Sequence, residues 1–448
     1  MNAESARILR SVGSENVNST AETGLNLNNL TKLVLKILYV RGVDTALELS
    51  DNIKLHIAIC KELLERAKDQ GLVEILGSNS HEGYTDFRYG LTGKGREWSV
   101  DALRQSLYVG PAPVTLDDYT RQVLKQSVMN AQVRRETLLE RFSGLVVPDT
   151  LERRLGPAVN SGRALLLYGA PGNGKTTIAE AIGKTFGGTI KIPYCVEIDG
   201  EIIKVFDPVF HDEIAVDEDP DDRDASAPVQ RAEYTDRRWV VCHRPVIVVG
   251  GELRIEMLDL NFSSTARFYE APLQMKANGG TFLVDDLGRA FVTPTELLNR
   301  WIVPMEKRID FLALQSGSTF SVPFDNLLIF STNLEPSDLM DAAFLRRIPY
   351  KVEVTYPSYE DYQTVFEIVC RSRDLAMDKE VVAFAMREIQ CTHKQPLAFY
   401  QPKFIVDQII SACKYTGQEP ELTLEFVEEA MKNISARTSE SSTMTSEQ

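Results

Sequence analysis

The sequence predicts an α/β protein whose central core is preceded by a small domain of helices and one hairpin and followed by a helical domain. Three apolar runs of strand length, at 164–168, 281–284 and 326–331, each lead into glycine or polar residues, as buried parallel strands do. Before and after this central part, apolar residues recur at helical spacing. With 448 residues, the chain has room for two or three domains.

Composition and charge describe an ordinary globular chain. Hydrophobic residues make up 43% and charged residues 25%, and the formal net charge of -15 argues against a protein that coats nucleic acid or anionic membrane. No apolar run approaches the roughly 18 residues of a membrane span, and the N-terminus lacks the apolar core of a secretory signal. Six cysteines without metal-ligand spacing indicate reduced thiols, so we expect a cytoplasmic protein without membrane insertion.

The N-terminal part predicts a lead and a small domain. Residues 1–26 are rich in Ser, Asn, Thr and Glu, and we expect them to be disordered. In residues 27–108, two helical patterns that each end at a glycine precede a hairpin with its turn at 77–80, and a further helix starts at Gly93. This order resembles a winged helix, and an anonymous helical unit is the alternative. Residues 27–104 hold 11 Lys/Arg and 11 Asp/Glu, so this domain has no surplus of positive charge to neutralise DNA phosphates. We therefore weigh binding of a protein and binding of DNA by the wing equally.

The rest of the chain divides by composition. We expect a proline-containing linker and a charged helix over 109–141, the core over 142–355 and a helical lid over 356–434. Residues 212–224 carry eight acids, which favours a solvated insertion loop over a cation site. The tail, 435–448, resembles the lead in composition and is expected to be disordered.

The strongest motif begins where the first core strand ends. The strand runs into Gly169-x-x-x-x-Gly174-Lys175-Thr176, and a helical pattern follows. Glycines let backbone N–H groups turn toward a polyphosphate, and the helix N-terminus adds its positive end. Lys175 can reach the outer phosphates, and the Thr176 hydroxyl can ligate Mg²⁺. The pattern predicts that a nucleoside triphosphate is bound by Gly169, Ala170, Pro171, Gly172, Asn173, Gly174, Lys175, Thr176 and Thr177.

Two further strands end in polar residues that suit this chemistry. A phosphate loop needs a second strand that brings a carboxylate to the magnesium shell, and TFLVDD provides it. We expect Asp285 to hold Mg²⁺ and Asp286 to face the water that attacks the γ-phosphate. The strand NLLIFSTN ends in Asn333, whose amide can orient the same water or sense the γ-phosphate.

Together these motifs resemble the AAA+ ATPases, over about 150–434. GAPGNGKTT corresponds to Walker A, FLVDD to Walker B and IFSTN to sensor 1. The resemblance implies a three-layer α/β/α P-loop core, in which helices cover both faces of a five-stranded parallel sheet. It also implies a helical lid, ATP as the nucleotide, and assembly into rings, usually hexamers. The stretch before IFSTN resembles the subgroup with a hairpin before sensor 1, which includes MoxR-type chaperones, magnesium chelatase subunits and bacterial enhancer-binding activators. The GAFTGA loop of those activators is missing, which counts against a sigma-54 remodelling role.

Three more site residues come from the resemblance. The segment DAAFLRRIPYKV is similar to the one that presents an arginine finger to the neighbouring subunit, with Arg347 first and Arg346 second. The alternative is two exposed arginines beside a helix end. The segment QPKFIVDQII resembles the sensor 2 helix, where Lys403 stands in place of the family's usual arginine.

The family usually carries glutamate where this chain has Asp286. Because aspartate is one methylene shorter, hydrolysis is expected to be slow or to depend on a partner, unless the backbone adjusts to bring the carboxylate closer.

The leading hypothesis is a Mg²⁺-dependent ATP hydrolase whose ring remodels a protein client. The alternatives are an ATP-gated DNA-binding transcription regulator and a nucleotide-binding scaffold with little turnover.

Overall fold

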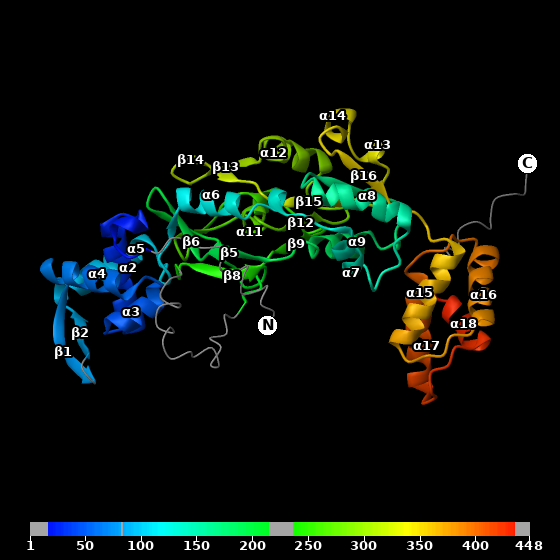
Figure 1. Cartoon of the computed structure of the whole chain (residues 1–448), viewed down its shortest axis with the longest axis horizontal. Coiled ribbons are helices and arrows are strands. Elements are labelled where there is room, and N and C mark those ends of the chain that lie inside the picture. The colour runs from blue at the N-terminus through cyan, green and yellow to red at the C-terminus, as the bar shows by residue number, and fades with distance from the viewer. Residues whose placement is uncertain (1–16, 82–83, 215–235, 435–448) are drawn as a thin grey trace, which may run out of the picture. The chain divides into compact units, whose positions relative to one another are not determined.

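The computed structural model describes residues 17–81, 84–214 and 236–434 (Figure 1). The chain divides into two compact units. The first holds Met1–Gln132, Phe186–Leu283 and Ala290–Leu328, and the second holds Val133–Thr185, Val284–Arg289 and Ile329–Gln448. The segment from Phe186 to Leu283, which we had assigned to the nucleotide-binding core, therefore belongs to the same unit as the N-terminal domain.

The predicted lead is shorter than expected. Residues 1–16 of the lead, residues 215–224 of the acidic insertion and the whole predicted tail lie outside the described residues. Within 17–26, by contrast, the chain forms a 3₁₀ turn, η1 (Ala21–Thr23), and packs onto the first domain. Thr23 is buried, and the Thr20 hydroxyl donates a hydrogen bond of 2.7 Å to Glu62. The ordered domain thus begins about ten residues before the predicted limit.

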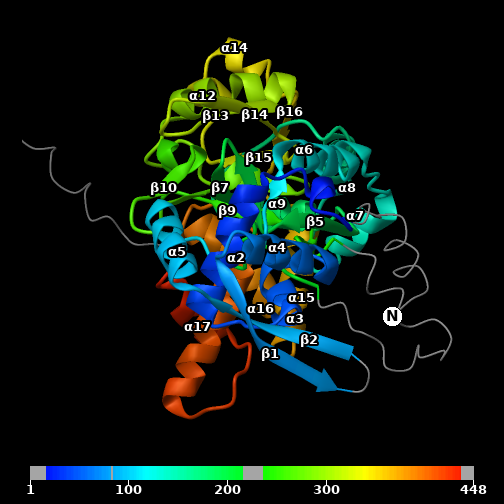
Figure 2. The same ribbon diagram turned by 90° about the vertical axis from the view of Figure 1, so that its left-hand side faces the viewer.

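The N-terminal domain contains the predicted helices and a hairpin (Figure 2). The turn predicted at 77–80 is wrong, because these residues are part of β1 and pair with β2. Its elements are α2 (Leu27–Arg41), α3 (Ala46–Ile53), α4 (Ile57–Asp69), β1 (Val73–His81), β2 (Tyr84–Leu91) and α5 (Gly93–Gln105). Helix α3 was not predicted. Its N-cap, Thr45, accepts a hydrogen bond from the Glu48 amide and also forms an antiparallel bridge with Arg88 of the hairpin. The bridge ties β2 to the start of α3, and the leucine-rich faces of the helices form one core.

The first unit also contains strands that the sequence analysis did not identify. One sheet has the order β10-β11-β7-β6-β3. Its strands are β3 (Val114–Thr115), β6 (Cys195–Ile198), β7 (Glu201–Lys204), β10 (Asn261–Ser263) and β11 (Phe268–Glu270). Two antiparallel pairs accompany it: β5 (Thr189–Pro193) with β8 (Trp239–His243), and β13 (Ile309–Ala313) with β14 (Thr319–Pro323). The predicted linker is therefore partly a strand, because Val114 pairs with Val196.

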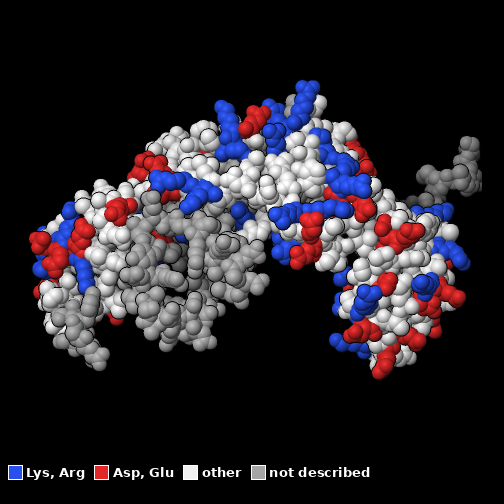
Figure 3. Space-filling view, in the orientation of Figure 1, with Lys and Arg blue, Asp and Glu red and all other residues white. Residues whose placement is uncertain are grey.

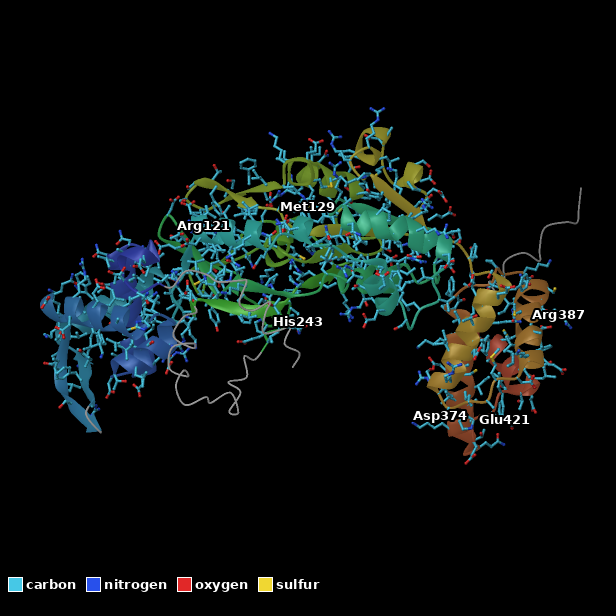
Figure 4. All side chains as sticks on the ribbon, in the orientation of Figure 1. Arg121, Met129, His243, Asp374, Arg387 and Glu421 are labelled. Carbon is cyan, nitrogen blue, oxygen red and sulfur yellow. The ribbon has the colours of Figure 1, made fainter. Side chains whose placement is uncertain are left out.

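The charged helix predicted to follow the linker is interrupted. The structure has α6 (Leu116–Lys125), the turn η2 (Val128–Asn130) and α7 (Arg135–Arg141) instead; Figure 4 labels Arg121 in α6 and Met129 in η2. The Asp325 carboxylate accepts hydrogen bonds from the Ser127 hydroxyl at 2.7 Å and the Val128 amide at 3.0 Å. These bonds satisfy groups that a continuous helix would pair internally, so the helix ends there.

The three predicted core strands are β4 (Leu165–Tyr168), β12 (Thr281–Val284) and β15 (Leu327–Thr332). With β9 (Val246–Val249) and β16 (Tyr350–Glu353) they form a sheet of order β16-β4-β15-β12-β9. Both β15 and β16 pair with β4 in parallel. Every residue of β12 and β15 is buried, as in a sheet covered on both faces. The predicted α/β fold class is confirmed.

Further helices divide between the two units. The second unit holds α8 (Asp149–Asn160), α9 (Lys175–Gly183), α13 (Pro336–Leu339) and α14 (Ala342–Leu345). The first unit holds η3 (Ile255–Leu258), α11 (Leu273–Lys276) and α12 (Pro294–Lys307).

The predicted helical lid is a bundle with its own apolar core. It consists of α15 (Tyr359–Ser372), α16 (Lys379–Arg387), the π-helical turn η4 (Glu388–Thr392), α17 (Gln401–Thr416) and α18 (Leu424–Met431). Ser358 and Asp361 form a capping box that starts α15, and Gly417 ends α17 in the left-handed conformation. Figure 3 shows cationic and anionic side chains interspersed on the visible face of the bundle. Within the described part of the chain, no helix has the length and apolarity needed to cross a membrane.

Lys36 of α2 is 5% exposed, and its Nζ donates a hydrogen bond of 3.2 Å to the Ser106 carbonyl. Burial, followed by the nearby charge of Lys32, lowers the pKa of Lys36 from 10.5 to about 8, and Cys195 opposes the shift. Between these pH values the unfolded chain binds a proton that the folded chain does not. The contribution of Lys36 to stability should therefore rise with pH in that window.

We predict that the free energy of unfolding of the wild type, minus that of Lys36→Met, increases by about 3 kcal/mol from pH 8 to pH 10.5. Urea unfolding across this range measures it. Lys68→Met is the control, because the hydrogen bond that Lys68 donates to Glu65 raises the pKa of Lys68 and gives the opposite sign. A flat difference for Lys36→Met would contradict the prediction.

Candidate nucleotide-binding site

The phosphate loop has the strand, turn and helix that the motif predicts. The loop follows β4, and α9 begins at Lys175. Gly169, Gly172 and Gly174 have φ values of 134°, 78° and 80°, which side chains rarely adopt. A Cβ on Gly169 would also lie 2.5 Å from the Val354 carbonyl oxygen. Glycine is required here both by backbone conformation and by the close approach of the strand beside it.

Lys175 lies beneath this loop and is 5% exposed. Its ammonium donates hydrogen bonds to the carbonyls of Gly169 and Ala170, both at 2.9 Å, and to Asn333 Oδ1 at 2.6 Å. Burial lowers the pKa of Lys175, while the carboxylates of Asp286 and Asp285 act in the opposite direction. The structure thus joins the end of β15 to the phosphate loop, as the motif spacing predicts.

The first carboxylate after β12 meets the first helical turn after the loop. The Thr176 hydroxyl donates a hydrogen bond of 2.8 Å to Asp285 Oδ2. A hydroxyl and a carboxylate at this separation fit Mg²⁺, which prefers oxygen ligands and completes its shell with water and phosphate oxygens. The described residues contain no cluster of three or more His, Cys, Asp or Glu side chains that could hold a metal alone. This pair therefore suits a cation that arrives with a phosphorylated ligand.

The second carboxylate is held in a defined position. Asp286 has a φ of 51°, and its Oδ1 accepts a hydrogen bond of 3.0 Å from Asn333 Nδ2. The turn that follows is fixed to β15 by the Leu287 amide, which donates to Ser331, and by the Thr332 hydroxyl, which donates to the Leu287 carbonyl. Asn333 therefore bonds Lys175 through its oxygen and Asp286 through its nitrogen.

A cavity of about 740 Å³ opens beside the loop, within the second unit. Its wall includes Leu145, Val146 and Val147, and Gly174 and Thr177 of the phosphate loop region. The lid contributes apolar side chains, namely Val365, Ile368, Val369, Phe399 and Phe404. An apolar cavity next to a phosphate-binding loop can take the base and sugar of a nucleotide.

The sequence analysis missed one lid residue that touches the loop. The Tyr400 amide donates a hydrogen bond of 3.0 Å to the Gly172 carbonyl, and a Cβ on Gly172 would lie 2.4 Å from the Tyr400 ring. Tyr400 precedes the predicted sensor 2 helix and has no motif of its own, so only the fold reveals it. Lys403 lines the same cavity, but its ammonium is paired with Asp407 at 2.8 Å.

Asn173, a predicted nucleotide-binding residue, also lines this cavity. It is 2% exposed, and neither the oxygen nor the nitrogen of its side-chain amide has a hydrogen-bond partner among the described residues. Leaving such a group unpaired costs about 1–3 kcal/mol, which a polar group of a ligand would recover.

The two candidate finger arginines lie at the end of the strands that is opposite the phosphate loop. They precede β16, whose first residue, Tyr350, is in register with Leu165 at the start of β4, whereas the phosphate loop follows the end of β4. The Arg347 guanidinium lies 5.9 Å from the centre of the Phe344 ring, and Arg346 is exposed. The length of β4 alone separates this edge from the phosphate loop by about 10 Å.

In the comparison with known proteins, a family model matches the lid but not the chain as a whole. A family model described as a domain of unknown function (DUF8689) matches residues 358–433, which correspond to α15–α18. No curated protein matches the sequence. Figure 4 labels Asp374, Arg387 and Glu421 within the matched segment.

Several solved structures are similar at low scores. Domain III of the replication initiation protein DnaA from Thermotoga maritima is 15% identical, with a TM-score of 0.36, covering 65% of this chain and 95% of that one. NtrX from Brucella abortus is 16% identical, with a TM-score of 0.38 and coverage of 75% and 66%. The RuvB Holliday junction branch migration motor from Thermotoga maritima is 12% identical, with a TM-score of 0.34 and coverage of 67% and 69%. Similarity at this level fixes neither a shared activity nor a shared ligand.

We predict that Gly172→Ala weakens binding of a fluorescent ATP analogue about tenfold, which corresponds to about 1.4 kcal/mol. The added methyl group would clash with the Tyr400 ring, and the alanine would have to adopt the positive φ of Gly172. Gly144→Ala is the matched control, because Gly144 lines the same cavity with open space around it. Equal affinities in the two variants, measured by fluorescence titration, would contradict the prediction.

Proposed function

We propose that this chain is an ATPase of the AAA+ type, which binds ATP with Mg²⁺ and hydrolyses it to ADP and phosphate. The observation that carries the proposal is the continuous set of contacts from Lys175 through Asn333 to Asp286, beside the Thr176–Asp285 pair. These five side chains come from three places, namely the start of α9, the end of β12 and the end of β15, and the fold brings them together at one end of the strands. Such convergence is expected of a site for phosphoryl transfer.

Each residue has a defined part in the proposed reaction. The loop amides and Lys175 bind the phosphates, and Thr176 and Asp285 hold Mg²⁺, which offsets the charge that develops on the phosphate oxygens. The oxygen of a water molecule forms a bond to the γ-phosphorus while the bond from that phosphorus to the bridging oxygen breaks. Asp286 accepts a proton from the water, and Asn333 fixes the direction of the Asp286 carboxylate.

The conformation of Asp286 bears on how well aspartate replaces the usual glutamate. Its φ of 51° lies in the left-handed region, which aspartate tolerates better than glutamate does. The strand end is therefore shaped for the shorter residue. This supports the alternative in which the backbone adjusts and Asp286 is a competent base.

The position of Arg347 supports a shared site. Because the arginine lies at the end of the strands opposite its own phosphate loop, it can serve the γ-phosphate of a neighbouring copy in a ring, which the family resemblance implies to be a hexamer. Arg346 is the second candidate for this role.

The biological task is proposed from the same resemblance. A ring that moves its lid during hydrolysis would remodel a protein client, with the N-terminal domain choosing the client. The β13–β14 pair directly precedes β15, which supports the subgroup with a hairpin before sensor 1.

We predict that Asp286→Asn retains ATP binding and loses at least a hundredfold in turnover, because the amide cannot accept the proton. Asp286→Glu should not exceed the wild type, since glutamate must adopt the same positive φ. Steady-state phosphate release measures both, with Lys175→Ala as the blank. A faster Asp286→Glu enzyme would show that side-chain length limits the reaction.

A second prediction concerns the neighbouring copy. Arg347→Ala has an intact phosphate loop but no finger, and Lys175→Ala has a finger but no working loop. Each variant alone should be inactive, and their mixture should regain a fraction of wild-type turnover from mixed rings. A mixture without activity, in which native mass spectrometry shows mixed rings, would exclude Arg347 and direct the same experiment to Arg346→Ala.

A further inference from the structure

A second cavity lies in the first unit, which does not contain the phosphate loop. Its volume is about 360 Å³, at the small end of the range for ligand sites. It is bounded by α2, by the C-terminal end of α5 and by the turn between β6 and β7. Its polar lining consists of Asn29, Lys32, Lys36, Gln105, Ser106, Glu197 and Glu201.

The α2 side of the cavity carries two ammonium groups. Lys36 is almost fully buried and bonds only the Ser106 carbonyl, while Lys32 donates to Gln105 Oε1 at 2.8 Å. Neither forms an ion pair with any residue in the described ranges. A buried ammonium without a counter-charge is costly, so an anionic group at this position would be favourable.

The β6–β7 side of the cavity carries two carboxylates that form no ion pair with a described cation. Glu197 accepts a hydrogen bond of 3.1 Å from Asn29 Nδ2, and Glu201 forms no ion pair within the described part of the chain. Burial raises the pKa of Glu197, and burial lowers that of Lys36, as expected of charges that are not neutralised. The cavity thus holds separated charges of both signs that do not pair with one another.

This distribution selects the ligand class by charge. A polyanion such as a phosphate would meet Glu197 and Glu201, and a simple amine would meet Lys32 and Lys36. A zwitterion can place its carboxylate toward the lysines and its ammonium toward the glutamates. The remaining lining includes Leu30, Leu33 and Ala102, which suits an aliphatic side chain.

We propose that this cavity binds a free aliphatic α-amino acid, with its carboxylate on Lys36 and its ammonium on Glu201. The site is independent of ATP hydrolysis, since no residue of the phosphate loop contributes to it.

Thermal unfolding and calorimetric titration of the full chain test the proposal with L-alanine, L-valine, L-leucine and L-isoleucine. At least one should bind and raise the melting temperature. The matched probes for leucine are 4-methylpentanoate, which lacks the ammonium, and 3-methylbutylamine, which lacks the carboxylate. Each should bind at least tenfold more weakly than the amino acid, because each loses one charge pair.

Two variants assign the contacts, and one serves as a control. Lys36→Met and Glu201→Gln should each weaken binding of the amino acid at least tenfold, whereas Lys68→Met, on the exposed surface of α4, should not. Circular dichroism verifies that each variant is folded. Absence of binding by all four amino acids would overturn the proposal, as would a deaminated or decarboxylated probe that binds equally well. Unchanged affinity in both cavity variants would also overturn it.

Discussion

The candidate site depends on the register between two strands. In the parallel pair of β4 and β15, Thr332 is opposite Tyr168, so Asn333 follows β15 at the same end of the strands at which the phosphate loop follows β4. That register places the Asn333 amide on the ammonium of Lys175, which is otherwise surrounded by the loop carbonyls. A slip of one residue would direct the amide to the other face of the sheet and leave a buried ammonium with one partner fewer.

Local sequence signals were sufficient for the parts of the fold that repeat a short pattern. The buried runs β4, β12 and β15 were each predicted within a residue or two, because a strand covered on both faces is apolar throughout. The phosphate loop was predictable for a related reason. Its glycines are required by backbone conformation, and the residues that contact the ligand are adjacent in sequence. The convergence of Lys175, Asp286 and Asn333 followed from placing polar residues at parallel strand ends.

The features that were missed depend on partners distant in sequence. The helix break near Ser127 requires a carboxylate almost two hundred positions away, at Asp325, and a helical pattern alone gives no sign of it. The two-residue strand β3 exists because β6 lies beside it. Tyr400 touches the phosphate loop through a backbone amide, a group that every residue except proline has. No residue type distinguishes these positions, so only the tertiary structure identifies them.

The chemistry of Asn333 explains why the residue type could be predicted although its contacts could not. One side of it is an ammonium, which needs an acceptor, and the other is a carboxylate, which needs a donor. An aspartate would satisfy Lys175 and repel Asp286, and a lysine would do the reverse. A side-chain amide satisfies both with one planar group, and the two charged neighbours fix its orientation. The amide therefore couples the group proposed to bind phosphate to the group proposed to accept the proton, so that neither can move without disturbing the other.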